Sequence, residues 1–269
     1  MSTFFNVGTS WPGYAGIKKI FVFGDSYSYN GYHTQSPVPS ASQPMGVPFP
    51  GAPNNEPGRP NWIGHLIRSF GHGQANMLVY DYAIRGDTIQ GVRGQIASSF
   101  VPVIGKKPSW APWRASDSLF VTWIGVNDCR LMLEPKPADI DAIVANLFLA
   151  QEQLYVTGAR NFLFIDLPPI HRSPAGSNAV GNYGARFWGF NEAIKRKIQE
   201  FAANHPDATL VLYSSWAAFT RVLDNPAAYG FSAADVAVQG GSIWFDHIHP
   251  TSKMHQLLAR EIVQLLSSR

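Results

Sequence analysis

The stretch FVFGDSYS, residues 21–28, joins a short apolar segment to a polar turn. The β-branched and aromatic residues of 17–23 predict a buried strand, which the turn at Gly24-Asp25-Ser26 ends. Ligands of open α/β sheets bind in the crevice outside the carboxyl ends of the strands. Ser26 is therefore a candidate nucleophile, although a Gly-Asp-Ser turn is also typical of a helix N-cap.

Further apolar segments resemble strands, and helical patterns separate them. The expected strands lie at 77–82, 118–124, 161–167 and 208–213, and the expected helices at 61–67, 138–156, 183–204 and 252–266. Strands that alternate with helices at this spacing predict a parallel sheet with helices on both faces. With residues 17–23 included, we expect an α/β fold with a five-stranded parallel sheet.

Composition limits the class of protein. The chain has 269 residues, enough for one large domain, and no shift in composition divides it, so we expect a single domain at 1–269. The 21 basic and 18 acidic residues are scattered, which argues against nucleic acid as a partner. No apolar run approaches the roughly 20 residues of a membrane span. Cys129 is the only cysteine, so no intramolecular disulfide can form.

The cellular compartment is left open between two alternatives. Charged residues make up 14% of the chain, which suits a secreted or sugar-facing surface. The first eight residues, MSTFFNVG, have neither the basic start nor the apolar middle of a signal peptide. We expect either a secreted protein in its mature form or a cytoplasmic one.

A proline-rich segment follows Ser26. Residues 29–60 hold eight of the 20 prolines, too many for a helix or a strand. Long loops inside a compact domain are often functional. Because this segment leaves the sheet at the candidate nucleophile, we expect it to form a wall near the active site; the alternative is an ordinary solvated loop.

Two further turns follow expected strands and contain groups suited to stabilising an oxyanion. Gly86 follows the strand at 77–82, and a glycine lets backbone N–H groups approach a reacting carbonyl closely. Asn127, in Gly125-Val126-Asn127-Asp128, can offer its side-chain amide. The alternatives are an ordinary turn glycine, with Asp87 capping the next helix, and a common Asn-Asp turn.

The segment WFDHIHPT, residues 244–251, contains an aspartate and two histidines just before the last expected helix. A zinc site would need a third ligand at a recognisable spacing, and none is evident. We expect His249 to be a general base that Asp246 orients, as in a Ser-His-Asp triad. If the segment is extended, His247 points to the other side, and we expect it to be structural.

Together these blocks resemble the SGNH, or GDSL, hydrolase superfamily. The matching residues are Gly24-Asp25-Ser26-Tyr27, Gly86 within IRGDT, Gly125-Val126-Asn127-Asp128, and Asp246 to Pro250. The resemblance is closest to the fungal acetylesterases of carbohydrate esterase family sixteen, through GRPNW at 58–62, NFLFIDLPP at 161–169 and LDNP at 223–226. The sequence departs from many relatives in having Asp81 in place of asparagine and Arg85-Gly86 in place of a glycine pair.

The resemblance implies a flavodoxin-like three-layer α/β/α sandwich and a serine esterase that needs no cofactor or metal. Ser26 would be the nucleophile, with His249 and Asp246 as its partners and the Ser26, Gly86 and Asn127 donors as the oxyanion hole. The implied substrate is an acetyl ester of a sugar or xylo-oligosaccharide.

The sequence leaves two other functions open, and it offers candidate residues that would hold the substrate. A lipase or lysophospholipase acting on longer acyl chains is the alternative within hydrolases, and a carbohydrate-binding protein on the same fold is the alternative outside them. Aromatic residues near the blocks could form a platform for a sugar ring, although aromatics on a sheet are more often core. These are Tyr27, Trp123 and Trp244, with Trp188 and Phe245.

Overall fold

The computed structural model describes residues 1–69, 77–132, 136–177, 179 and 183–269. In this part of the chain a six-stranded sheet has the order β1-β6-β5-β4-β2-β3. Its strands are β1 Thr3–Asn6, β2 Lys19–Gly24, β3 Leu78–Asp81, β4 Ser118–Trp123, β5 Asn161–Ile165 and β6 Thr209–Tyr213. Neighbouring strands are parallel except β1, which pairs antiparallel with β6.

The five expected parallel strands are confirmed, but the expected number of strands is too low by one. The missing strand, β1, has four residues, all partly exposed, at the edge of the sheet. A four-residue edge strand has no alternating pattern long enough to recognise. Its place depends on pairing with β6, about 200 residues away in the chain, which no local pattern encodes.

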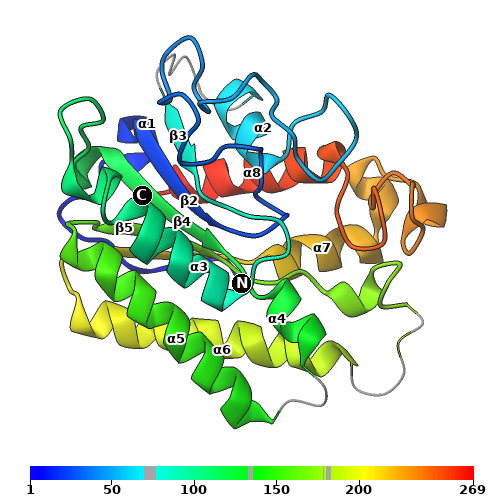
Figure 1. Ribbon diagram of the computed structural model, residues 1–269. Coiled ribbons are helices and arrows are strands. Elements are labelled where there is room, and N and C mark those ends of the chain that lie inside the picture. The colour runs from blue at the N-terminus through cyan, green and yellow to red at the C-terminus, as the bar shows by residue number, and fades with distance from the viewer. Residues whose placement is uncertain (70–76, 133–135, 178, 180–182) are drawn as a thin grey trace.

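Helices cover both faces of the sheet, so the expected α/β/α sandwich is confirmed. Figure 1 shows α3, α5 and α6 on one face and α2 and α8 on the other. The helices are α1 Gly13–Gly16, α2 Trp62–Ser69, α3 Ile89–Gly94, α4 Val126–Leu131, α5 Pro137–Val156, α6 Tyr183–Asn204, α7 Ser215–Asp224 and α8 Ser252–Leu266. The expected α6 and α8 are confirmed to the residue, whereas α7 was not expected.

Stacked aromatic rings align the strands that carry the candidate site. Phe21 on β2 lies directly opposite Tyr80 on β3 and Phe120 on β4. Its ring stacks on both, with centroids 5.1 and 4.9 Å apart. A slip of one residue would move these rings to the other face of the sheet. The stack therefore fixes the register in which β2, β3 and β4 end side by side.

The proline-rich segment, 29–60, forms neither a helix nor a ladder strand. It is held at both of its ends, because the Asn61 side chain donates to the carbonyl of Ser28 at 2.8 Å. Between these ends, Arg85 donates to Asn54 Oδ1 at 2.6 Å and to the Ala52 carbonyl at 2.7 Å. The segment therefore lies against Arg85, the residue that precedes Gly86.

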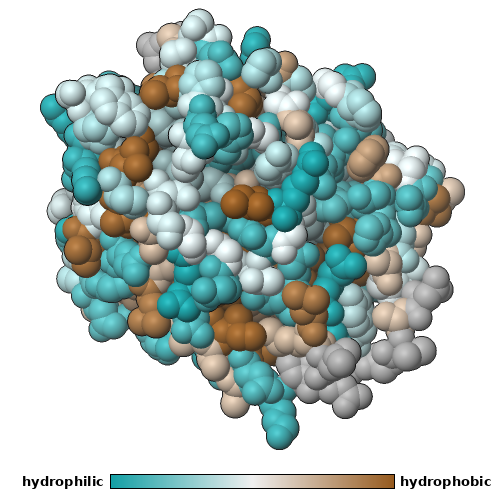
Figure 2. Space-filling model, in the orientation of Figure 1, coloured by the Kyte–Doolittle hydropathy of each residue, from teal (hydrophilic) through white to brown (hydrophobic). Residues whose placement is uncertain are grey.

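The surface shows no continuous apolar area on the face drawn in Figure 2, where the most hydrophobic residues are scattered among hydrophilic ones. Among the described helices, none combines the length and the apolar character needed to cross a membrane.

Candidate active site

A chain of hydrogen bonds joins three of the expected site residues. Ser26 Oγ lies 2.7 Å from His249 Nε2, and His249 Nδ1 lies 2.7 Å from Asp246 Oδ2. Ser26 follows β2, whereas the other two residues lie in the loop before α8, 223 positions further along the chain for His249. Ser26 and His249 are buried. The structure thus brings the expected nucleophile, base and carboxylate together in a single line.

The carboxylate is held in place by its own loop. Asp246 Oδ1 accepts hydrogen bonds from the backbone N–H groups of Ile248 at 2.8 Å and His249 at 2.7 Å. Burial alone would raise the pKa of Asp246, but the bonds from the His249 ring and from these N–H groups outweigh it and hold the pKa well below its ordinary value. Asp246 is therefore a permanent anion beside the imidazole.

The loop that holds Asp246 and His249 is tightly folded. The expectation for His247 had assumed an extended segment. The backbone N–H of Phe245 donates to the carbonyl of His249 at 2.9 Å, closing a turn over the residues between them. His247 is exposed, and its Nδ1 lies 3.8 Å from Asp246 Oδ1. Its ring lies outside the hydrogen-bonded line.

The two expected oxyanion segments are in direct contact with each other. Asn127 Nδ2 donates to the backbone carbonyl of Asp87 at 2.8 Å. The Asp128 carboxylate accepts from the backbone N–H of Ile89, the first residue of α3, at 3.1 and 3.2 Å. Two successive side chains of the turn after β4 thus hold the segment that follows Gly86.

Glycine is required at both turns for different reasons. Gly86 has a φ of +79°, in the left-handed region that other residues rarely adopt, although a Cβ there would meet no atom within 4 Å. Gly125 has a φ of +122°, and a Cβ there would lie 2.2 Å from the ring of Phe190. The first glycine serves the backbone conformation alone, and the second also allows α6 to pack against the turn.

Gln95 connects the turn at Gly24-Asp25-Ser26 to the Gly86 segment, and no sequence pattern singled it out. Its side-chain oxygen accepts from the Gly24 N–H at 3.0 Å. Its amide donates to the Gly24 carbonyl at 2.8 Å and to Asp87 Oδ2 at 2.7 Å. Gln95 lies where α3 widens into a π-helical turn, Gln95–Phe100. Nothing in the local sequence distinguishes it from an exposed helical glutamine, although it is buried.

Three carboxyl groups lie close together beneath these turns. Burial raises the pKa of Asp25 to about 7; the hydrogen bond from the Tyr27 N–H opposes this rise, and the charges of Asp128 and Asp87 add to it. Burial also raises the pKa of Asp128, to about 6, against the bond from Ile89, and raises that of Asp87. Keeping these groups ionised therefore costs folding free energy at neutral pH.

The expectation that Tyr27, Trp123 and Trp244 contact substrate is wrong. Their exposed fractions are 1%, 1% and 0%. Tyr27 donates to the carbonyl of Ile248 at 2.5 Å, and its ring packs against Trp123 and His249. These aromatic rings are buried beneath the site. They support its residues and expose no ring face to a substrate.

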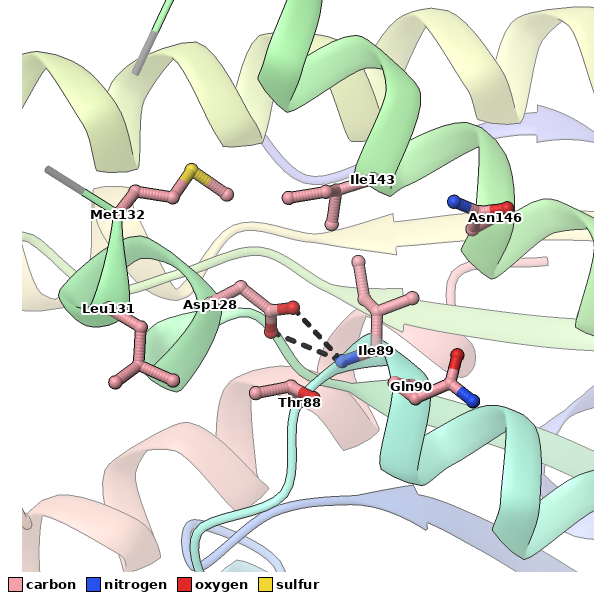
Figure 3. Close-up of a pocket in the computed structure, with 8 residues that line it drawn as sticks. All are labelled: Thr88, Ile89, Gln90, Asp128, Leu131, Met132, Ile143 and Asn146. Carbon is pink, nitrogen blue, oxygen red and sulfur yellow. Dashed lines mark hydrogen bonds between the residues drawn. The ribbon is translucent and has the colours of Figure 1, made fainter. Parts of the chain in front are cut away.

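A pocket of about 310 Å³ opens between α3, α4 and α5, beside the Asp128 contact. Figure 3 shows the Asp128 carboxylate directed at the Ile89 N–H, with Leu131, Met132 and Ile143 around the space. Its lining is mostly apolar, and Thr88, Gln90 and Asn146 complete it.

Comparisons with known proteins identify the family of the chain. The family described as GDSL-like Lipase/Acylhydrolase matches residues 20–262, and the chain belongs to it. An acetylesterase of Thermothelomyces thermophilus is 32% identical over 267 residues, which cover 91% of this chain and 87% of that protein. The protein is therefore a carboxylic ester hydrolase, and the alternative of a carbohydrate-binding protein without activity is set aside.

Solved structures show the same fold at low sequence identity. The lipase/acylhydrolase from Enterococcus faecalis has a TM-score of 0.54 and 16% identity, with 94% of this chain and 97% of that one covered. The acetyl xylan esterase AlAXEase has a TM-score of 0.56 and 14% identity, with 91% and 97% covered.

The raised pKa of Asp25 predicts how stability changes with pH. A carboxyl whose folded pKa exceeds its unfolded value of 3.8 stabilises the protein at low pH, and this contribution is lost as pH rises to about 7. Asp25→Asn cannot ionise. We expect its free energy of unfolding, relative to the wild type, to rise by about 2 to 3 kcal/mol between pH 5 and pH 8.

Urea denaturation at the two pH values measures this difference. The control is Asp141→Asn, which removes a half-exposed carboxylate of α5. Its effect should be the same at both pH values. A difference between Asp25→Asn and the wild type that does not change with pH would contradict the charge cost assigned to Asp25.

Proposed function

We propose that this hydrolase is a serine esterase that removes short acyl groups, chiefly acetyl, from sugars or xylo-oligosaccharides through an acyl-enzyme on Ser26. The observation that carries the proposal is the line of hydrogen bonds from Asp246 through His249 to Ser26, with 2.7 Å at each link. These distances let His249 accept the serine proton without any rearrangement.

The chemistry follows from the position of each group. Ser26 Oγ attacks the acyl carbon while His249 Nε2 takes its proton, and Asp246 stabilises the imidazolium that forms. His249 then gives the proton to the leaving alcohol, and the acyl group stays on Ser26. A water molecule repeats the sequence: His249 takes its proton, the acid is released, and Ser26 recovers its hydrogen.

The oxyanion of each tetrahedral intermediate would be held by the backbone N–H groups of Ser26 and Gly86 and by the Asn127 amide. An amide has two N–H bonds, and one of those of Asn127 is directed at the Asp87 carbonyl. The second is then oriented by the first, without further loss of side-chain freedom. Preorganised donors of this kind are often the largest single contribution to catalysis.

Acetate is the acyl group that the relative with 32% identity supports, since that protein is described as an acetylesterase. The second candidate, a lipase or lysophospholipase, is favoured by the apolar pocket between α3, α4 and α5. That pocket adjoins Asp128, next to Asn127 in the chain, and Leu131, Met132 and Ile143 could contact a longer acyl chain (Figure 3).

Acyl-chain length separates these two candidates. We expect nitrophenyl acetate to be hydrolysed faster than esters of four or more carbons, and acetylated xylo-oligosaccharides to release acetic acid. Ser26→Ala serves as the blank and should lose most activity, on the order of a million-fold. A preference for chains of eight carbons or more would assign the protein to the lipases, and a folded Ser26→Ala protein with wild-type turnover would refute the assignment of the nucleophile.

Removal of the Asn127 amide tests the oxyanion hole. Asn127→Ala should lower kcat by about 10² to 10³-fold with little change in KM, because the donor acts chiefly in the transition state. The matched control is Asn204→Ala, because Asn204 is exposed at the C-terminal end of α6; this variant should retain wild-type kcat. A loss confined to KM in Asn127→Ala would instead place this amide in ground-state binding.

A further inference from the structure

A second pocket lies at the carboxyl end of the sheet, outside the residues to which the reaction has been assigned. Its volume is about 490 Å³. It opens between the 3-10 turn Ile170–Arg172 that follows β5, the first turns of α6 and the start of α7. Its described lining includes His171, Ser177, Tyr183, Trp188 and Trp216.

Two indole rings form a corner in this pocket. The rings of Trp188 and Trp216 have centroids 5.5 Å apart and planes at 64°. Trp216 is fixed in place, because its backbone N–H donates to Asp166 Oδ1 at 2.8 Å and its ring packs on His171. Trp188 is 51% exposed, an unusual position for the largest apolar side chain. A fixed corner with an accessible ring face is suited to a flat, partly apolar ligand.

The lining is uncharged. It contains no lysine, arginine, aspartate or glutamate among the described residues. The nearby Arg172 is paired with Asp224 at 2.7 Å. Burial, together with the charge of Arg172, lowers the pKa of His171, so its ring is neutral at neutral pH. An anionic ligand would find no positive partner in this lining, which favours a neutral one.

The lining also offers polar groups. His171 Nδ1 is buried and has no hydrogen-bond partner among the residues that the structure describes. A buried ring nitrogen without a partner costs free energy, and a rotation of the ring that brought it to a ligand hydroxyl would recover that cost. Ser177 adds an exposed hydroxyl. Aromatic faces combined with a few hydrogen-bonding groups match a pyranose ring, which has apolar C–H faces and hydroxyls around its edge.

The pocket is linked to the catalytic loop. The backbone N–H of Ala175 donates to the carbonyl of His247 at 2.9 Å, between Asp246 and His249. Figure 1 shows the segment after β5, the start of α7 and the loop before α8 at the same end of the sheet. In the strand order, β5 and β6 lie two and three places from β2. At roughly 5 Å per strand, β5 and β6 lie about 10 to 15 Å from β2 across the sheet, so the pocket beyond their ends is a few sugar rings from Ser26.

We propose that the pocket of Trp188, Trp216 and His171 binds a sugar ring of an oligosaccharide whose acetyl group is at Ser26, a few rings away. This inference rests on the proposed function, because it names the part of that substrate that lies beyond the ester. The pocket would make the enzyme selective for the length of the oligosaccharide. A short acetylated sugar contacts only the site at Ser26, whereas a longer one also contacts the indole corner.

Kinetics on substrates of different length test this subsite. Trp188→Ala should raise KM for acetylated xylohexaose by about tenfold, with kcat within twofold of wild type. For acetylated xylobiose and nitrophenyl acetate, both constants should stay within twofold, and Trp188→Phe should recover part of the loss. The matched control is Trp110→Ala, since Trp110 is 54% exposed but lines a different pocket, formed in part by the loop before β4. An unchanged KM for the hexaose, or an equal change for all three substrates, would overturn the proposal.

Binding without turnover separates failure of the subsite from failure of the proposed function. Unmodified xylohexaose is titrated calorimetrically into Ser26→Ala protein and into the Ser26→Ala, Trp188→Ala double variant. Binding to the first that is lost in the second supports the subsite even if no acetylated xylo-oligosaccharide is hydrolysed, an outcome that would refute only the proposed substrate. Equal binding by both proteins, or none by either, overturns the subsite even if deacetylation is observed.

Discussion

The hydrogen bond between Ser26 Oγ and His249 Nε2 joins the first parallel strand of the sheet to the loop before the last helix. Both of its ends are fixed by backbone contacts. Gly24, two residues before the serine, exchanges hydrogen bonds with the Gln95 side chain, and the histidine loop is closed around Asp246 Oδ1. The bond can therefore form only when β2 is in register and α8 is packed, so the site is a product of the complete fold.

The same edge of the sheet carries a cost in stability. Asp25 and Asp128 are buried carboxyls with raised pKa values, and each accepts a backbone hydrogen bond that shapes a turn: Asp25 from Tyr27, and Asp128 from Ile89. An apolar residue at either position would avoid the cost but leave a buried N–H without a partner. The stacked rings of Phe21, Tyr80 and Phe120 lie beneath and contribute apolar burial that offsets such costs.

The strands and long helices could be predicted because their residues repeat at the period of the element they form. In α8, for example, Met254, Leu258 and Ile262 recur every four residues and are all buried. The candidate triad could be proposed because Ser26 lies in a turn that ends a strand, and Asp246 and His249 lie three positions apart just before the last expected helix. Gln95 could not be proposed in this way, since it bonds to backbone groups of Gly24, which is 71 positions away in the chain. The expectation for Trp123 was wrong because a tryptophan at a strand end has the same local pattern whether its ring faces substrate or core.

Activation of Ser26 by Asp246 and His249 can be measured directly by covalent labelling. The protein is treated with a fluorophosphonate, and the labelled peptide is located by mass spectrometry. We expect one label per chain, on Ser26, with labelling slowed by orders of magnitude in a folded His249→Ala variant. A label on any other residue, or equally fast labelling of Ser26 without His249, would contradict it.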